Sequence, residues 1–326
     1  ACEFTNATTT QAYDPRAHGW ATDLLDRLDI PSDIFPEVVR PGMPLGTLLP
    51  SVAEEVGLAA RTPVVAVASH DTGSAVAAVP ADTAALRAGE TFAYVSSGTW
   101  SLVGGEVTEP VITPQALAYN FTNEGGVSGF RLLKNVMGLW LVQECRRTWR
   151  ERGAAHSYAD LADMAAGARP FAALVDPDDP AFLPPGDMPR RLAEFCARTG
   201  QAVLDPDDKG QVVRCAFESL ALKYRWVIER LERLTGRRVG VIHIIGGGSQ
   251  NALLNQFTAD ACNRPVLAGP SEATAIGNAV VQAIAAGRLG SLAEGRDLIR
   301  RSFPLATYEP QSPRVWDEAY GRLVGT

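Results

Sequence analysis

The C-terminal part of the chain most strongly constrains the fold, because strand and helix patterns alternate within it. An apolar run, Val239–Ile245, predicts a strand, and the consecutive glycines Gly246–Gly248 predict a tight turn directly after it. A helix is expected over 251–262, a second strand over 265–268 and a second helix over 273–286. This alternation is typical of a sheet covered by helices, so the sequence predicts an α/β protein with three layers.

The composition is that of an ordinary globular enzyme. The 326 residues are 46% hydrophobic and 21% charged, which predicts two domains or one large α/β domain. A formal net charge of −7 without a dense run of Lys and Arg argues against a nucleic-acid partner. No apolar stretch reaches the roughly 20 residues that span a bilayer, and the N-terminus lacks the blocks of a signal peptide. We therefore expect a cytoplasmic protein without a membrane partner.

The cysteines and histidines do not form a metal-binding pattern. The five cysteines and four histidines are scattered without C-x-x-C or H-x-x-x-H spacing, so no zinc site and no other metal ligand is predicted. Reduced, buried thiols are the expected state. A disulfide between Cys196 and Cys215 is the alternative.

Several further elements are expected from periodicity and from turn residues. Apolar residues recurring every three or four positions predict a core helix over 217–234 that Gly236 ends. The remaining expected elements are a helix over 20–28, an irregular connection over 31–50, a helix over 52–57, a hairpin over 91–104, a helix over 132–150 and a long loop or lid over 176–189.

Asp71 is the leading candidate for a catalytic residue. It follows the apolar run Val64–Ala68 and has small or hydroxyl-bearing neighbours. Polar groups at the end of a buried strand lie at the sheet edge where open α/β folds bind ligands. The alternative is that Asp71 caps a helix that begins near Ser74. Ser69, His70 and Asp71 are adjacent in sequence, which argues against a hydrolytic triad.

Two glycine turns are candidates for phosphate binding. Gly246–Gly248 stands before a helix whose first amides favour an anion, although a purely structural turn is the alternative. Neither a G-x-G-x-x-G fingerprint nor a P-loop is present, which disfavours an NAD-dependent dehydrogenase. Ser96–Thr99 offers amides and the Thr99 hydroxyl. The polar stretch 120–129 is either a loop between hairpin strands or a binding element. Together with Asp71, these turns point to phosphoryl transfer to a hydroxyl.

At the level of motifs the chain resembles a known family over nearly its whole length. It is similar to the FGGY carbohydrate kinases in five motifs that follow the family's order: Ser69–Thr72, Ser96–Leu102, Asn123–Gly126, Leu133–Trp140, and Gly246–Asn251 with Asp260–Cys262. The resemblance implies the actin-like ATPase fold, in which two ribonuclease-H-like domains flank a cleft. It assigns residues 1–80 to an incomplete first, sugar-side domain and residues 81–326 to a complete second, nucleotide-side domain.

The resemblance also implies roles for individual residues. Asp71 would be the general base, and it would bind the sugar together with His70, Thr72 and Asn135. The implied nucleotide-binding residues are Thr99, Gln143, Gly246, Gly247, Gly248 and Asn251. ATP and Mg²⁺ are the implied cofactors.

The expected reaction is phosphorylation of the 1-hydroxyl of a ketose, with L-rhamnulose as the first expectation. The alternatives are L-fuculose or another sugar of the family, or a non-catalytic module that binds nucleotide. The family's glycine-rich phosphate hairpin, with the Asp that helps to hold Mg²⁺, has no counterpart in this sequence. We therefore expect the chain to be a fragment, and its oligomeric state stays open.

Overall fold

The computed structural model describes residues 1–324. These residues form two compact units. Unit 1 comprises residues 1–82, 105–133 and 272–304. Unit 2 comprises residues 83–104, 134–271 and the described residues from 305 onward. The predicted domain limits at residue 80 stay a prediction.

Unit 1 combines short strands with helices around a small aromatic core. Phe4 and Phe130 pack edge to face with their ring centroids 5.5 Å apart, and Tyr13 also packs edge to face with Phe4 at 5.7 Å. The elements of this unit, with β10 continuing into unit 2, are β1 (Cys2–Glu3), α1 (Phe4–Ala7), β2 (Tyr13–Asp14), β3 (Gly19–Trp20), α2 (Thr22–Arg27), η1 (Ser32–Ile34), β4 (Val38–Val39), β5 (Pro44–Thr47), α3 (Pro50–Val56), β6 (Pro63–Val65), α4 (Asp71–Ala77), α5 (Pro114–Ala118), β9 (Thr122–Gly126), β10 (Gly129–Val136), α11 (Ala273–Ala285) and α12 (Leu292–Ser302).

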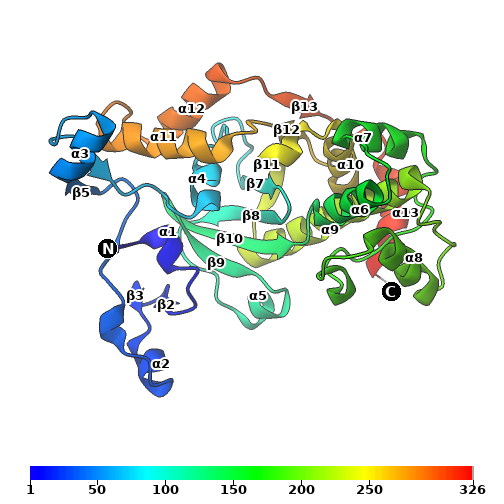
Figure 1. The fold of residues 1–326 in the computed structure, drawn as a ribbon, viewed down its shortest axis with the longest axis horizontal. Coiled ribbons are helices and arrows are strands. Elements are labelled where there is room, and N and C mark those ends of the chain that lie inside the picture. Colours follow the sequence, from blue (N-terminus) through cyan, green and yellow to red (C-terminus); the bar gives the residue numbers. More distant parts are fainter. Residues whose placement is uncertain (325–326) are drawn as a thin grey trace. The chain divides into compact units, whose positions relative to one another are not determined.

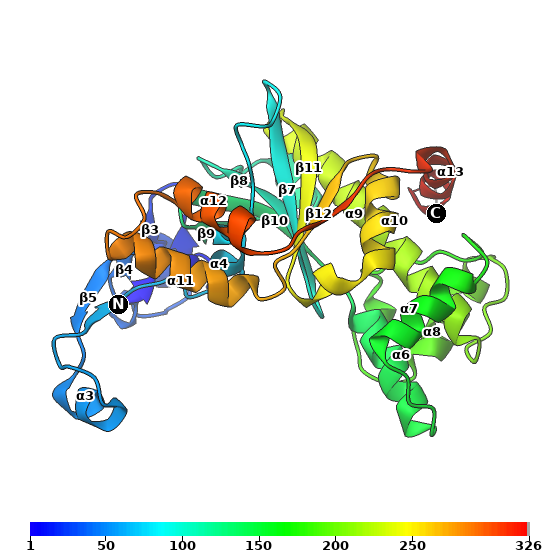
Figure 2. The same cartoon turned by 90° about the horizontal axis from the view of Figure 1, so that it is seen from above.

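Helices α4 and α11 lie side by side in unit 1 (Figures 1 and 2). Their contact depends on Gly277, because a Cβ atom there would lie 1.8 Å from the carbonyl oxygen of Ser74. Helix α12 is fixed by Arg296, which forms an ion pair with Glu106 at 2.9 Å and donates to the carbonyl of Val76 at 3.0 Å. Helix α4, which begins at Asp71, is therefore held by close backbone packing.

Unit 2 is built on strands covered by longer helices. Strand β11 pairs in parallel with β7 and with β12. The order of strands and helices from β11 to α11 is the one that the alternating sequence pattern predicts. Helices α9 and α10 pack beside these strands (Figure 2). The elements of this unit are β7 (Glu90–Ser97), β8 (Ser101–Val107), which ends in unit 1, α6 (Trp140–Glu151), α7 (Tyr158–Gly167), η2 (Pro180–Phe182), α8 (Met188–Arg198), α9 (Lys209–Thr235), β11 (Arg238–Ile245), η3 (Gly247–Gln250), α10 (Ala252–Cys262), β12 (Val266–Ala268), β13 (Ala306–Tyr308) and α13 (Pro313–Val324).

The largest sheet is mixed. Within the described residues it has seven strands in the order β13-β12-β11-β7-β8-β10-β9. The predicted hairpin over 91–104 is confirmed as β7 and β8, and the predicted core helix is confirmed as α9. Gly236 ends α9 with a φ of 66°, a left-handed conformation that suits glycine.

Several predictions from the sequence are wrong. The stretch over 31–50, expected to be irregular, contains the short strands β4 and β5, and β5 pairs with β6. The apolar run Val64–Ala68, expected to be a buried strand, contributes only its first two residues to β6, and that strand is exposed or half-buried.

Two longer elements also differ from the prediction. The stretch predicted as one helix over 132–150 begins as strand β10, and helix α6 starts only at Trp140. Strand β10 is buried on both faces, and such a run shows no alternation that separates it from a helix. The stretch over 120–129 is not mainly a turn, because Thr122–Gly126 form strand β9. Gly125 permits this strand to pass Phe4, since a Cβ atom would lie 2.7 Å from that ring.

Other expectations concern the thiols, the long loop and membrane-spanning segments. The five cysteines are free thiols in the structure, and four of them are buried. The loop over 176–189 is anchored within unit 2, since Lys223 Nζ lies 2.7 Å from Asp176 and 3.1 Å from Asp178. Among the described residues, no helix has both the length and the apolar character needed to cross a bilayer.

Candidate functional site

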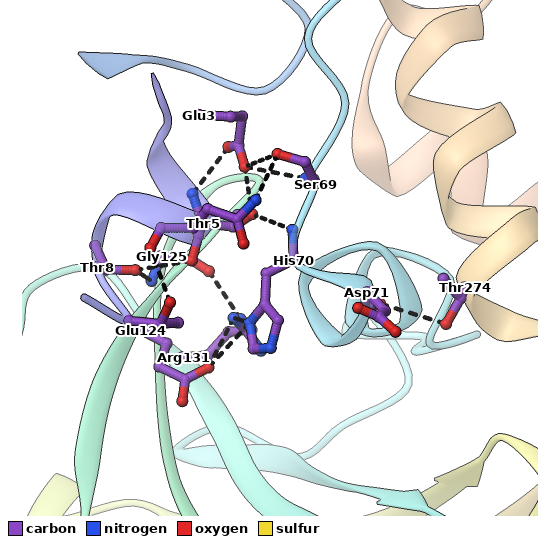
Figure 3. A network of polar contacts seen from close by, with 12 residues as sticks. Glu3, Thr5, Thr8, Ser69, His70, Asp71, Glu124, Gly125, Arg131 and Thr274 are labelled. Atoms are coloured by element: carbon purple, nitrogen blue, oxygen red, sulfur yellow. Dashed lines mark hydrogen bonds and ion pairs between the residues drawn. The ribbon is translucent and has the colours of Figure 1, made fainter. Parts of the chain in front are cut away.

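Asp71 is the first residue of helix α4, and its side chain is exposed. The residue that caps this helix is His70, and none of the described residues hydrogen-bonds to the Asp71 carboxylate. The Asp71 backbone carbonyl accepts a hydrogen bond from Thr274 Oγ1 at 3.4 Å (Figure 3). The reading of Asp71 as a helix cap is therefore wrong, and its carboxylate is available to a ligand.

A buried carboxylate holds the backbone just before Asp71. Glu3 accepts hydrogen bonds from the amide and the hydroxyl of Ser69, both at 3.0 Å, and from the amide of Thr5 at 2.9 Å. The Thr5 hydroxyl donates to Glu3 and accepts from the amide of His70 at 3.0 Å. These contacts join the N-terminal residues to the loop that presents Asp71 (Figure 3).

The His70 ring lies against a buried ion pair on strands β9 and β10. Its Nδ1 is 3.1 Å from Arg131 Nη2 and 3.4 Å from Glu124 Oε2, and the Arg131–Glu124 distance is 3.0 Å. Arg131 is fully buried, and its Nε donates to the Gly125 carbonyl at 2.8 Å. Burial raises the pKa of Glu124, but the His70 ring in its protonated form and the Arg131 charge outweigh burial, so the pKa of Glu124 lies below its ordinary value.

In unit 2 the two glycine turns lie together at one sheet edge. Strands β7 and β11 run parallel, with Ser96 beside Ile245, so the turns that follow them meet. A Cβ atom at Gly248 would lie 2.0 Å from Ser97 Oγ, which only glycine avoids. Gly247 is exposed, and no atom lies within 4 Å of the position that its Cβ would take. This backbone is therefore open to a ligand.

The turn that contains Thr99 is fixed by the start of α6. The amides of Leu139 and Trp140 donate to the carbonyls of Gly98 and Thr99, both at 3.0 Å. Below the turn, the buried Tyr224 hydroxyl lies 2.7 Å from Ser101 Oγ, and burial raises the pKa of Tyr224 to about 12. The Thr99 side chain itself is exposed.

The other candidate residues have different surroundings. Gln143 lies half-buried in the first turn of α6, and Asn135 is exposed on β10. Asn251 caps helix α10 by accepting from the Leu254 amide at 3.0 Å, so its side-chain oxygen already has a structural task. Thr72 lies half-buried next to Asp71 in unit 1. The ligand-binding roles of all these residues stay predictions.

Sequence reasoning missed the residues that support His70. Arg131 is the strongest signal that was available, because an arginine between Phe130 and the apolar pair Leu132–Leu133 requires a partner if that segment is buried. Glu124 lies in a motif that had been noted, but without a role. Within residues 1–324, no group of three or more His, Cys, Asp or Glu side chains is placed to hold a metal ion.

Comparison with solved structures identifies the class of fold. The structure is similar to that of ligand-bound xylulose kinase from Lactobacillus acidophilus, with a TM-score of 0.74 at 16% identity, covering 99% of this chain and 63% of the other. For Plasmodium falciparum glycerol kinase with ADP, the TM-score is 0.72 at 15% identity, covering 99% and 62%. The fold is thus the actin-like ATPase fold.

The sequence then identifies the family. The chain belongs to the FGGY family of carbohydrate kinases, since residues 1–78 match the family's N-terminal domain and residues 93–286 its C-terminal domain. It is 50% identical to the rhamnulokinase of Bacteroides thetaiotaomicron over 319 residues, which is 98% of this chain and 63% of that protein. It is 42% identical to the rhamnulokinase of Oceanobacillus iheyensis, covering 94% and 62%. The chain spans under two thirds of the length of these relatives.

Proposed function

We propose that the protein is an ATP-dependent sugar kinase that phosphorylates the 1-hydroxyl of L-rhamnulose, with Asp71 as the general base. The observation that carries this proposal is the Asp71 carboxylate, which is exposed at the start of α4, accepts no hydrogen bond from a described residue, and is preceded by a rigidly held loop. Identity of 42–50% to rhamnulokinases supports the choice of sugar and a role in rhamnose metabolism.

In the proposed reaction the Asp71 carboxylate accepts the proton of the sugar hydroxyl. The hydroxyl oxygen forms a bond to the terminal phosphorus of ATP, and the bond from that phosphorus to the ADP oxygen breaks. Most of the rate enhancement in such transfers comes from positioning and charge stabilisation. His70, Thr72 and Asn135 would orient the sugar.

The nucleotide is assigned to the paired turns of unit 2. The open backbone at Gly247, the positive φ of 82° at Gly246 and the exposed Thr99 hydroxyl are suited to phosphate oxygens. Gln143 and Asn251 would contribute side-chain amides, Asn251 through its Nδ2 group. The described residues do not provide a group of three or more His, Cys, Asp or Glu side chains that fits Mg²⁺.

Replacement of Asp71 by Asn tests the general base. Asp71→Asn keeps the size of the side chain but removes most of its capacity to accept a proton. We expect turnover to fall by about 10²–10⁴-fold, with the KM for ATP within about twofold of wild type. The measurement is ADP release by the complete gene product with a saturating sugar.

Asp23 offers a matched control. It is also an exposed aspartate in the first turn of a helix of unit 1, α2. Asp23→Asn should leave turnover unchanged. Near-normal turnover in Asp71→Asn would refute the role of Asp71 as base.

A panel of substrates tests the sugar. L-rhamnulose, L-fuculose, D-xylulose and glycerol should be compared by kcat/KM, and L-rhamnulose should give the highest value. A higher value for another sugar would reassign the protein within the family. If ATP stabilises the protein against thermal unfolding but no sugar causes ADP release, a non-catalytic nucleotide-binding module would be favoured.

A further inference from the structure

The contacts of the His70 ring are confined to one of its two nitrogens. Nδ1 faces the Glu124–Arg131 pair, and all the dashed contacts of the ring in Figure 3 end at this atom. Nε2 makes no hydrogen bond to any residue in the described part of the chain. The side chain is 26% exposed, so this second nitrogen is left for a ligand.

The neighbours of Nδ1 determine where the ring carries its proton. Arginine has five N–H donors, no acceptor, and a permanent charge. The 3.1 Å contact between Arg131 Nη2 and His70 Nδ1 is therefore a hydrogen bond only if Nδ1 is unprotonated. A neutral imidazole without a proton on Nδ1 has its proton on Nε2.

The competing arrangement has Nδ1 donating to Glu124, and the geometry disfavours it. The distance from Nδ1 to Glu124 Oε2 is 3.4 Å, beyond the usual range for such a bond. The same oxygen already accepts from Arg131 Nη2 at 3.0 Å. Each of the two hydrogens on Nη2 then has an acceptor, one on Glu124 and one on His70.

We propose that Arg131 and Glu124 are positioning residues that hold His70 as the neutral tautomer with its proton on Nε2, ready to donate to an oxygen of the sugar. This inference rests on the proposed function, because it takes the sugar to bind at His70 and Asp71. The site then presents one fixed donor, His70 Nε2, and one acceptor, the carboxylate of the next residue, Asp71. Such a pair orients a substrate that has an acceptor oxygen close to the hydroxyl that reacts.

The burial of the pair explains why it can set the tautomer. Arg131 is fully buried and Glu124 is 6% exposed, so water cannot compete for the Nδ1 lone pair from their side. Arg131 is also fixed by its bond to the Gly125 carbonyl, and the Gly125 amide in turn donates to Thr8 Oγ1 at 2.7 Å. The guanidinium thus has a defined place on strands β9 and β10.

The first test reads the tautomer directly and requires no enzymatic activity. Nitrogen-15 NMR of the four histidine rings in the complete gene product separates protonated from unprotonated ring nitrogens, and the signals absent from His70→Asn belong to His70. We expect Nε2 to carry the proton at neutral pH. In Arg131→Met the Nδ1-protonated form should gain population. A wild-type ring protonated on Nδ1 would overturn the proposal.

The second test separates positioning from general stability. Arg131→Met should raise the KM for sugar by about 3- to 10-fold, the loss of one hydrogen bond, with little change in the KM for ATP. Arg131→Lys keeps the charge beside Glu124 and serves as the conservative variant. We expect it to raise the KM for sugar less than Arg131→Met does. If Arg131→Met fails to fold, Arg131→Lys and the wild-type spectrum still decide the question.

Arg214 provides the matched control. It is a buried arginine of unit 2 paired with Glu218 at 2.7 Å, and its other bonds go to backbone carbonyls of 165–168. Arg214→Met should lower stability as Arg131→Met does, but leave the KM for sugar unchanged. Equal sugar KM values in both variants would refute the positioning role. A wild-type protein that phosphorylates none of the sugars would instead refute the proposed function.

Discussion

At the scale of single residues, the candidate base depends on groups that are far from it in sequence. His70 and Asp71 could be selected from the sequence because they are adjacent and follow an apolar run. The groups that hold them could not, since Glu3 lies 66 positions from Ser69 and Arg131 lies 61 positions from His70. Pairings of this kind are fixed only by tertiary packing, which local patterns do not encode.

Glu3 is the residue whose loss should disturb this loop most. Glu3→Gln keeps the shape but replaces a charged acceptor with an amide whose NH₂ group faces other donors. We expect a loss of about 1–3 kcal/mol in the free energy of unfolding, the usual cost of buried polar groups left unsatisfied, and a lower kcat from a less fixed Asp71. Denaturant unfolding and ADP-release assays measure both quantities.

Glu109 is a suitable control for this prediction, because it is exposed and forms no hydrogen bond or ion pair with another described residue. Glu109→Gln should be within about 0.5 kcal/mol of wild type, as is usual for surface substitutions. If Glu3→Gln is equally harmless, the Glu3 contacts do not support the loop.

At the scale of elements, the sequence predicted best where periodicity and glycine signals coincide. Helix α9 and the succession β11, η3, α10, β12 and α11 follow the predicted order because their apolar spacing and terminal turns agree. Strand β10 was mistaken for a helix because a strand buried on both faces has no alternation. The turns at Thr99 and Gly246 could be predicted from their glycine and hydroxyl content. That they lie together could not, because it depends on the parallel register of β7 and β11.

The close contact of α4 and α11 gives a prediction for a helical glycine. A Cβ atom at Gly277 would lie 1.8 Å from the Ser74 carbonyl oxygen, so Gly277→Ala must move the two helices apart. We expect a loss of about 1–3 kcal/mol in stability, typical of overpacking, and reduced turnover because α4 carries Asp71. Thermal unfolding and steady-state kinetics test the two effects.

The control is Gly321, an exposed glycine of α13 with no atom within 4 Å of the position of its Cβ. Gly321→Ala should stabilise the protein by about 0.5–1 kcal/mol through helix propensity alone. A Gly277→Ala variant as stable and active as Gly321→Ala would contradict the packing argument.

At the scale of the whole molecule, the pH below which the folded protein loses stability should depend on carboxylates that form ion pairs in the folded state. The pKa of Glu124 is lowered from its ordinary value of 4.5, because the His70 ring in its protonated form and the charge of Arg131 outweigh the effect of burial. A lowered folded pKa contributes stability that is fully present above the unfolded pKa and is lost as pH falls through the folded pKa. Burial raises the pKa of Glu218 despite Arg214, so that carboxyl works in the opposite sense.

We therefore expect the free energy of unfolding to fall as pH is lowered from about 5 through the range below 4.5, and Glu124→Gln to make this fall less steep. The variant should be less stable at pH 7, because Arg131 loses its charged partner, so the slope rather than the absolute value carries the test. Denaturant unfolding at a series of pH values measures it. Glu109→Gln should reproduce the wild-type slope, whereas a Glu124→Gln slope equal to wild type would show that Glu124 titrates alike in both states.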